Sequence, residues 1–307
     1  LPMIKRQVIH ASVLLQEVVD GLALKQGQTL LDGTIGGAGH SSALCRSVEG
    51  VVQVIGLDVD ADALVKATLG LKTYCKGTFT LLEENFRNLD QALQSLGLPK
   101  EEAVDAILLD LGWSSFQLEE SGRGFSFLSD EPLLMTLGRP EDTAFTARDI
   151  LNSWDEHHIK NILWGYGEER YAGRIGKRIV EGRKKHPILT TKDLVQVIQS
   201  AVPAVYRRGK IHPATKTFQA LRIAVNDELR TLQNGLEKGW RALKRDGRMA
   251  VISFHSLEDR IVKQFFQTKA KEKVAKLLTK KPIVPSREEI RQNTRSRSAK
   301  LRLIQKL

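Results

Sequence analysis

The first third of the chain alternates short apolar runs with longer segments in which apolar residues recur every three or four positions. Short apolar runs predict buried strands, and the longer spacing predicts helices that bury one face. The expected elements are strands at 29–32, 52–57, 79–82 and 103–111 and helices at 12–24, 61–71 and 89–96. Strands that alternate with helices in this way form a parallel sheet with helices on both faces. The pattern therefore predicts a doubly wound α/β domain.

The alternation stops near residue 113, and the next hundred residues show no strand pattern. This stretch begins as a loop and continues as helical segments at 148–152, 158–164, 170–184 and 192–202. We therefore expect residues 113–212 to form an all-helical domain. It would be inserted into a sheet domain built from residues 1–112 and 213–307.

The pattern of the sheet domain returns after residue 212. Apolar residues spaced by three and four run from Phe218 to Leu243 and predict one long helix, which starts just after Pro213. The remaining expected elements are a strand at 248–254, a helix at 257–273 and a final strand at 299–305. Residues 276–298 are basic and contain two prolines, so we expect an extended or irregular arm there.

A glycine-rich turn follows the first expected strand, with the sequence Asp32-Gly-Thr-Ile-Gly-Gly-Ala-Gly-His40. Glycine has no Cβ, so the backbone of such a turn can come close to a ligand. Asp58 ends the second strand about twenty positions after the glycines, which is the layout of a nucleotide-binding βαβ unit. The pattern predicts a site for an adenosine cofactor, and a tight turn without a ligand is the alternative.

Residues within and after the turn distinguish two kinds of adenosine cofactor. The dinucleotide fingerprint has a third glycine where this chain has Ser42. Asp32 opens the turn, and its carboxylate would repel a pyrophosphate but attract a cation. Asp58 and Asp110 also end strands, and three carboxylates at neighbouring strand ends are costly without positive partners. The pattern favours a sulfonium such as S-adenosylmethionine over the nicotinamide dinucleotide of a dehydrogenase.

Positive charge is concentrated in the second half of the chain. Residues 1–169 contain 13 basic and 25 acidic residues, a net charge of −12, whereas residues 170–307 contain 34 and 11, a net charge of +23. Between residues 170 and 216, 12 basic residues stand against only Glu181 and Asp193. This asymmetry predicts a nucleic-acid partner, and solvated helix faces are the alternative.

Other features of the composition narrow the class of protein. The sequence has no apolar run of about 18 residues and no signal-peptide pattern near its start, so we expect no membrane span. Cys45 and Cys75 have neither the spacing of a metal site nor that of a disulfide framework. We therefore expect a cytoplasmic protein without a metal. The sequence is compatible with a homodimer and does not decide the oligomeric state.

Eight motifs occur in order along nearly the whole chain. They are His10-Ala-Ser-Val-Leu-Leu-Gln-Glu17, the glycine turn, Leu108-Leu-Asp-Leu-Gly-Trp-Ser-Ser115 with Gln117-Leu118, Arg123-Gly-Phe-Ser-Phe127, Tyr166-Gly-Glu-Glu-Arg170, His212-Pro-Ala-Thr-Lys-Thr-Phe-Gln-Ala-Leu-Arg222, Ser253-Phe-His-Ser-Leu-Glu-Asp-Arg-Ile-Val-Lys263 and Asn293-Thr-Arg-Ser-Arg-Ser-Ala-Lys-Leu-Arg302. Together they resemble the MraW (RsmH) family of bacterial 16S ribosomal RNA cytosine-N4 methyltransferases. The resemblance implies a Rossmann-like class I S-adenosylmethionine-dependent methyltransferase sheet with an inserted all-helical domain. It also implies methylation of a cytosine in the decoding region of 16S rRNA, at the P site of the small ribosomal subunit.

The resemblance assigns cofactor contacts to individual residues. They fall on Ala38, Gly39, His40, Asp58, Phe86, Asp110 and Gln117. Asp58 would accept hydrogen bonds from the ribose hydroxyls, and Phe86 would flank the adenine. For Phe86, burial in the core is the alternative.

Methyl transfer to the exocyclic amine of cytosine requires in-line positioning and an acceptor for the amine proton. Asp110 and the Ser114 hydroxyl are the acceptors expected from their location. His255 is a second candidate for this role, and a structural histidine is its alternative.

The basic half of the chain would bind the RNA. The expected contacts are Arg178, Arg183, Lys184, Lys185, Arg207, Arg208, Lys210, Arg295 and Arg297. Trp113, Phe125 and Phe127 could stack on a base drawn out of the RNA, with burial as the alternative.

The chain departs from the family's usual pattern in one loop. The usual Asp-Gly-Pro-Leu-Asp-Met-Arg-Met is Asp130-Glu-Pro-Leu-Leu-Met-Thr-Leu137 here, so Leu134 and Thr136 replace an acid and an arginine. Loss of both partners of a charged pair can be neutral. The replacement leaves open a second function, that of a non-catalytic or retargeted RNA-binding relative in ribosome assembly.

Overall fold

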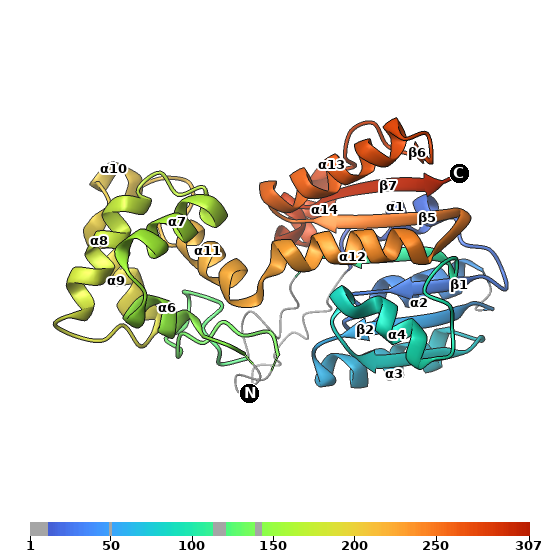
Figure 1. The fold of residues 1–307 in the computed structure, drawn as a ribbon, viewed down its shortest axis with the longest axis horizontal. Helices are drawn as coiled ribbons and strands as arrows, with labels where there is room; N and C mark the ends of the chain where they lie inside the picture. The colour runs from blue at the N-terminus through green and yellow to red at the C-terminus, as the bar shows by residue number, and fades with distance from the viewer. Residues whose placement is uncertain (1–11, 49–50, 113–120, 139–142) are drawn as a thin grey trace, which may run out of the picture. The chain divides into compact units, whose positions relative to one another are not determined.

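The chain forms two compact units in this computed structural model, which describes residues 12–48, 51–112, 121–138 and 143–307 (Figure 1). One unit comprises Leu1–Gly112 and Arg230–Leu307 and contains the sheet; we call it the sheet unit. The other comprises Trp113–Leu229 and is the helical unit. The sequence placed the second boundary at residue 212, whereas the compact unit extends to Leu229. The reason is that α11 (Thr215–Asn226) buries its apolar side chains in the core of the helical unit.

Seven strands of the described residues form one sheet in the order β3-β2-β1-β4-β5-β7-β6. Their bounds are β1 Thr29–Asp32, β2 Gln53–Asp58, β3 Phe79–Glu83, β4 Val104–Asp110, β5 Leu243–Ser253, β6 Ala275–Leu277 and β7 Lys300–Lys306. The five strands β3, β2, β1, β4 and β5 run parallel to one another, and β7 is antiparallel to β5 and β6. The mainly parallel, doubly wound sheet predicted from the sequence is confirmed.

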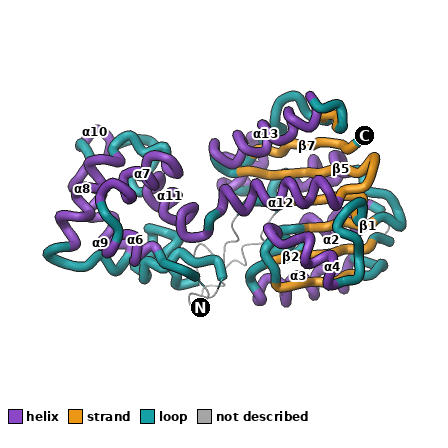
Figure 2. The backbone as a smooth tube through the Cα atoms, in the orientation of Figure 1, coloured by secondary structure: helices purple, strands orange, loops and turns teal. Residues whose placement is uncertain are grey.

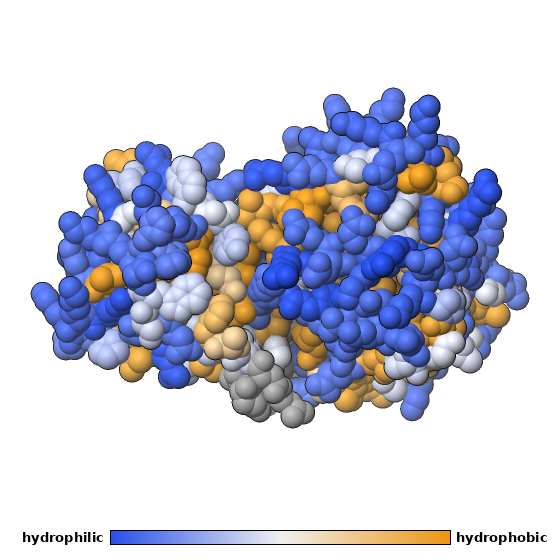
Figure 3. Space-filling view, in the orientation of Figure 1, coloured by the Kyte–Doolittle hydropathy of each residue, from blue (hydrophilic) through white to orange (hydrophobic). Residues whose placement is uncertain are grey.

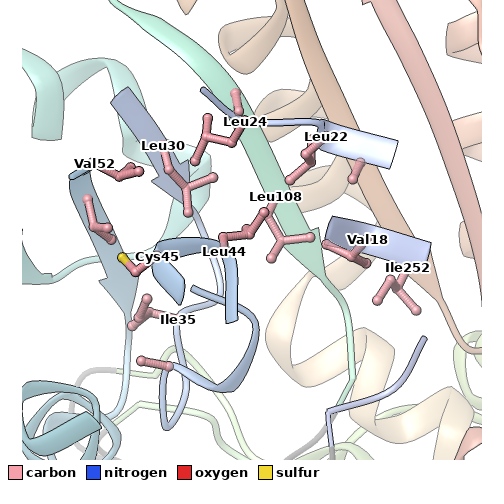
Figure 4. Packing of buried hydrophobic residues seen from close by; sticks show 14 of the residues in the cluster. Val18, Leu22, Leu24, Leu30, Ile35, Leu44, Cys45, Val52, Leu108 and Ile252 are labelled. Carbon is pink, nitrogen blue, oxygen red and sulfur yellow. The ribbon is translucent and has the colours of Figure 1, made fainter. Parts of the chain in front are cut away.

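Helices cover both faces of the sheet, as the ribbon and the tube show (Figures 1 and 2). The helices of this unit are α1 Leu15–Leu22, α2 Gly39–Ser47, α3 Ala61–Tyr74, α4 Leu89–Ser95, α12 Glu228–Ala242, α13 Ser256–Lys271 and α14 Arg287–Gln292, with 3-10 helices at Phe86–Asn88 and Thr294–Ser298. Successive strand residues point to opposite faces, so Leu30 packs with α1, α2 and α3 whereas Leu31 packs with α4, α12 and α13. Figure 4 shows the first of these two cores.

The order of the strands brings three acidic residues to one edge of the sheet. Asp58, Asp32 and Asp110 are the last residues of β2, β1 and β4, which are neighbours in that order. Because these strands are parallel, their carboxyl ends lie at the same edge. The sheet thus places the predicted cofactor residues together.

The single long helix expected after Pro213 is wrong, because the segment folds as two helices. Asp227 separates α11 from α12 and has a left-handed backbone with φ 48°. Aspartate is one of the few non-glycine residues that adopt this conformation readily. The apolar stripe continues across the break because Leu221 of α11 packs in the core of the helical unit and Leu236 of α12 in that of the sheet unit.

The prediction of an extended or irregular arm at 276–298 is also partly wrong. It contains α14 and a 3-10 helix, and Ile283 forms a β-bridge with Leu301. The Ser286 hydroxyl caps α14 by accepting a hydrogen bond from Glu289 N at 3.1 Å. The prolines therefore interrupt only the start of the arm, and the Ser-x-x-Glu capping pattern starts a helix after them.

The helical unit has its own apolar core. The helices in its described residues are α6 Ala147–Ser153, α7 Glu156–Gly167, α8 Ala172–Arg183, α9 Thr191–Ala201, α10 Ala204–Arg207 and α11. Capping boxes at Thr146 with Asp149 and at Thr190 with Asp193 start α6 and α9.

Hydrophilic side chains cover most of the visible face of the sheet unit (Figure 3). None of the helices in the described residues is long and apolar enough to cross a membrane.

Candidate active site

The glycine turn joins β1 to α2 through two residues with left-handed backbones. Gly36 has φ 49°, and Ala38 has φ 60° at the N-cap of α2. Ala38 N donates to Ile35 O at 2.7 Å, which closes the turn before Gly39 begins the helix. A Cβ added at Gly37 would meet no atom within 4 Å, so the turn is open at this position. The backbone of the turn is therefore accessible to a ligand at the carboxyl edge of the sheet.

Asp58 holds the glycine turn against the end of β2. Its carboxylate accepts hydrogen bonds from Gly36 N at 2.9 Å and from Asp60 N at 3.0 Å. Burial raises the pKa of Asp58, and these backbone hydrogen bonds oppose the rise. Each carboxylate oxygen has a second lone pair. Asp58 can therefore support the turn and still accept hydrogen bonds from a bound ribose.

Asp32 is a buried carboxylate at the start of the turn, with 2% of its surface exposed. It accepts hydrogen bonds from Thr34 N at 3.1 Å and from the Ser41 hydroxyl at 2.6 Å. Burial raises the pKa of Asp32 from 3.8 to about 6 despite these hydrogen bonds and the nearby His40. The negative charge of Asp110 adds to the rise. A cationic ligand would reduce the repulsion between the buried Asp32 carboxylate and the partly buried Asp110 carboxylate.

Asp110 is held at the end of β4 by hydrogen bonds of its backbone and of its carboxylate. Its backbone N donates to the Thr34 hydroxyl at 2.7 Å, and its Oδ1 accepts from Gly112 N at 3.1 Å. His40 Nδ1 lies 3.7 Å from Asp110 Oδ2. His40 Nε2 is 2.8 Å from the carbonyl oxygen of Val13, so Nε2 carries the proton and donates it there. His40 thus links the N-terminal segment to the carboxylate of Asp110.

Phe86 lies in the 3-10 helix after β3. It is partly buried against the core that Leu31 forms with α4, α12 and α13. A Cβ at Gly33 would come within 3.0 Å of Phe86, and one at Gly235 of α12 would collide with its ring. The two glycines therefore leave room for the ring beside the glycine turn. Phe86 both contacts the core and borders the predicted cofactor site.

His255 caps a helix. It is the N-cap of α13, and its Nδ1 accepts a hydrogen bond from Glu258 N at 3.4 Å. Its Nε2 lies 3.1 Å from a carboxylate oxygen of Glu258, and both side chains are almost fully buried. This geometry agrees with the structural role that the sequence left open for His255. The other two predicted site residues, Ser114 and Gln117, lie outside the described residues.

Two hydroxyl residues complete the network and were not expected from the sequence. Thr34 links the turn to Asp110, and Ser41 links α2 to Asp32. Their only signal in the sequence was their position, two and nine residues after Asp32. Hydroxyl residues are common in such turns, so position alone did not identify them.

The basic residues predicted to bind RNA lie on both units. Arg178, Arg183, Lys184 and Lys185 lie in or just after α8, Arg207, Arg208 and Lys210 lie in or just after α10, and Arg295 and Arg297 lie in the 3-10 helix of the sheet unit. All are exposed except Arg183 and Arg295, which are half-buried. Arg183 donates to Leu151 O at 2.9 Å and so also supports the fold.

A fully buried carboxylate, Glu169, connects the start of α8 to α10. It accepts hydrogen bonds from Tyr171 N at 2.8 Å and from the Tyr206 hydroxyl at 2.7 Å. Burial raises the pKa of Tyr206, and the hydrogen bond to Glu169 adds to the rise. The rings of Tyr171 and Tyr206 pack edge to face at 4.9 Å. Glu169 thereby fixes the helical segment that leads to Arg207 and Arg208.

The two residues that depart from the family pattern lie in the helical unit. Leu134 N donates to Arg123 O at 3.2 Å and to Pro132 O at 2.9 Å. Thr136 is fully buried, and its hydroxyl has no hydrogen-bond partner within the part of the chain that the structure describes. Neither residue belongs to the carboxylate network, so the departure leaves the cofactor residues unchanged.

The whole chain is similar to known methylases. Residues 7–307 match the MraW methylase family. Ribosomal RNA small subunit methyltransferase H of Heliobacterium mobile is 46% identical over 313 residues, which cover 97% of this chain and 99% of the relative. The protein of the same name from Persephonella marina is 44% identical over 300 residues, with 98% and 100% covered.

A solved structure of an rRNA methylase from Streptococcus thermophilus is also similar, with a TM-score of 0.44 and 12% identity over 95% of this chain and 93% of that one. The family match and the two relatives extend over nearly the full length, and they include the glycine turn and the strand ends described above. The chain therefore belongs to the MraW methylase family, which confirms S-adenosylmethionine as its cofactor.

Proposed function

We propose that the protein transfers a methyl group from S-adenosylmethionine to N4 of a cytosine in the decoding region of 16S rRNA. The observation that carries this proposal is the convergence of Asp32, Asp58 and Asp110 around the glycine turn at one edge of the sheet. The names of the relatives, which are small-subunit rRNA methyltransferases, support the class of substrate. The choice of cytosine N4 and of the decoding region rests on the family resemblance.

The residues at this edge fit the proposed cofactor. Asp58 has lone pairs for two ribose hydroxyls, and Gly37 leaves space beside the turn. Asp32 and Asp110 offer negative charge to the ammonium and sulfonium groups of the cofactor. Because burial holds the pKa of Asp32 near 6, a cation beside it would favour its ionised form at neutral pH. A dinucleotide pyrophosphate would instead add negative charge to this site.

Bound S-adenosylmethionine supplies an electrophilic methyl group on its sulfonium. The chain must then hold the cytosine amine in line with that methyl and accept the proton that the amine releases. The carboxylate of Asp110 accepts a hydrogen bond from the N–H of Gly112, and the backbone N–H of Asp110 donates to the hydroxyl of Thr34. We assign proton acceptance to the carboxylate of Asp110. His255 then has the separate task of capping α13 next to β5.

The basic segment 170–216 would hold the RNA through its phosphates. Its 12 basic side chains stand against two acidic ones, and most of the predicted contacts are exposed. Phosphate contacts release counterions, so the affinity should fall steeply with salt. The proposed partner is the small ribosomal subunit. Equal affinity for RNA at low and high salt would contradict this part of the proposal.

The test is transfer of a labelled methyl group to small subunits that lack the modification. Wild-type protein should incorporate label, and Asp58→Ala should not, because it loses both the support of the turn and the ribose contacts. Asp62→Ala is the matched control, since Asp62 is an exposed acid in the next helix. If the wild type bound cofactor and RNA but incorporated no label, the second function, that of a non-catalytic relative, would be favoured. Leu134 and Thr136, which replace the usual acid and arginine, motivate this alternative.

A further inference from the structure

An aromatic pair in the helical unit joins two of the sequence motifs. The rings of Phe127 and His212 are stacked, with centroids 4.4 Å apart and planes 15° apart. Phe218 of α11 supports Phe127 from the side, edge to face at 5.4 Å. Phe127 is half-buried, whereas His212 is exposed. The imidazole is thus the outer layer of a stack built on the core.

Local contacts hold the His212 ring in this position. Its Nδ1 accepts a hydrogen bond from Ala214 N at 3.3 Å. Burial of one side of the ring lowers the pKa of His212, which favours the neutral imidazole at physiological pH. The result is a flat, uncharged and exposed ring whose orientation is fixed by the fold.

The residues just before His212 are cationic. Arg207, Arg208 and Lys210 are all exposed and lie within five positions of it, and 58% of Ile211 is exposed. The segment is anchored at both ends, because the Tyr206 hydroxyl donates to the buried Glu169 and His212 stacks on Phe127. A segment fixed in advance loses little conformational freedom when it binds.

A flat ring beside several cations fits an unpaired nucleotide. Nucleobases present flat faces that stack on aromatic side chains, and their phosphates are bound by arginine and lysine. We propose that the exposed face of His212, backed by Phe127, stacks on an unpaired base of the RNA while Arg207, Arg208 and Lys210 contact adjacent phosphates. This proposal rests on the proposed function, because it takes RNA as the ligand. Phe125, the other aromatic of that motif considered for stacking, is 7% exposed and belongs to the core of the helical unit.

The probe is a single-stranded RNA oligonucleotide that carries 2-aminopurine, whose fluorescence changes on stacking. We expect His212→Ala to bind it about tenfold more weakly, a loss of about 1.4 kcal/mol, and to abolish the fluorescence change. His212→Phe keeps a flat ring and should retain both. His157→Ala is the matched control, since His157 is an exposed histidine of α7 in the same unit. Thermal unfolding and calorimetry with S-adenosylmethionine should be unchanged in all three variants.

Two results would overturn the stacking role. One is that His212→Ala binds the probe as tightly as the wild type, and the other is that His212→Phe binds as weakly as His212→Ala. Failure of this inference differs from failure of the proposed function. If only this inference fails, the wild type still binds RNA and transfers methyl groups. If the proposed function fails, the wild type binds no RNA at all. Capture of a protein by the His212 surface, with no effect of the variants on RNA affinity, would point to a protein partner and would also overturn the proposal.

Discussion

Asp32→Asn should stabilise the protein at neutral pH although it removes a residue of the candidate active site. Asp32 is buried, and its pKa rises from 3.8 to about 6 on folding, mainly because burial disfavours the charged carboxylate. An acid with a raised pKa binds more protons in the folded state than in the unfolded state between these two values. The unfolding free energy of the wild type therefore falls as the pH rises from about 4 to about 6. Asparagine is neutral and does not incur this loss.

The expected gain follows from the size of the shift. One unit of pKa corresponds to about 1.36 kcal/mol, so a shift of about two units costs the wild type about 3 kcal/mol above pH 6. Asparagine keeps an oxygen that can accept from Thr34 N, and the Ser41 hydroxyl can turn to accept from the new amide. We therefore expect Asp32→Asn to be more stable than the wild type by about 2–3 kcal/mol at pH 7.5. The difference should shrink towards zero near pH 4.

Urea unfolding at several pH values measures this difference. Asp259→Asn is the matched control with the opposite sign. Burial alone would raise the pKa of Asp259, but hydrogen bonds from Arg302 at 2.7 Å and Lys300 at 3.0 Å lower it. That carboxylate therefore stabilises the fold above pH 4, and its loss should cost about 2–4 kcal/mol at pH 7.5. A difference between wild type and Asp32→Asn that does not depend on pH, or a less stable Asp32→Asn at pH 7.5, would refute the reasoning.

Other predictions concern the two units separately. Glu169→Ala removes the buried carboxylate that accepts from Tyr171 N and the Tyr206 hydroxyl, so it should lower the unfolding free energy by about 1–3 kcal/mol in urea titrations; an unchanged midpoint would contradict this. Gly235→Ala should push the Phe86 ring aside and weaken S-adenosylmethionine binding in calorimetry, with about 1–3 kcal/mol of lost stability; full affinity would show that Phe86 is not needed at the site. Replacing Arg207 and Arg208 by alanine should reduce the slope of log affinity for RNA against log salt by about 1–2; an unchanged slope would show that neither contacts phosphate.

The strand ends could be predicted because strand pattern and position are local properties. Asp32, Asp58 and Asp110 each follow a short apolar run, and parallel strands bring such ends to one edge. The local pattern therefore predicted the sheet and the edge at which these three acids meet. The family match then confirmed the identity of the cofactor.

The remaining features depend on tertiary contacts that a local pattern does not contain. The apolar spacing runs through the break at Asp227 without interruption. Both helices bury an apolar face, α11 in the core of the helical unit and α12 in that of the sheet unit, so the pattern does not reveal where one helix ends. His255 was named as a catalytic candidate because it follows a strand, and the structure places it at the N-cap of α13, where its Nδ1 accepts a hydrogen bond from Glu258 N. Tyr206 lies 37 residues after Glu169 in the sequence, and no spacing rule connects the two.

The most direct test of the central claim is mass-spectrometric mapping of small-subunit RNA after incubation with the protein and S-adenosylmethionine. Unmodified small subunits serve as the substrate, with the wild type compared against Asp110→Asn. We predict one added methyl group on N4 of a decoding-region cytosine with the wild type and a strongly reduced amount with the variant. A methyl group on a ring carbon or ribose, or none on the RNA of subunits that bind the protein, would contradict the account.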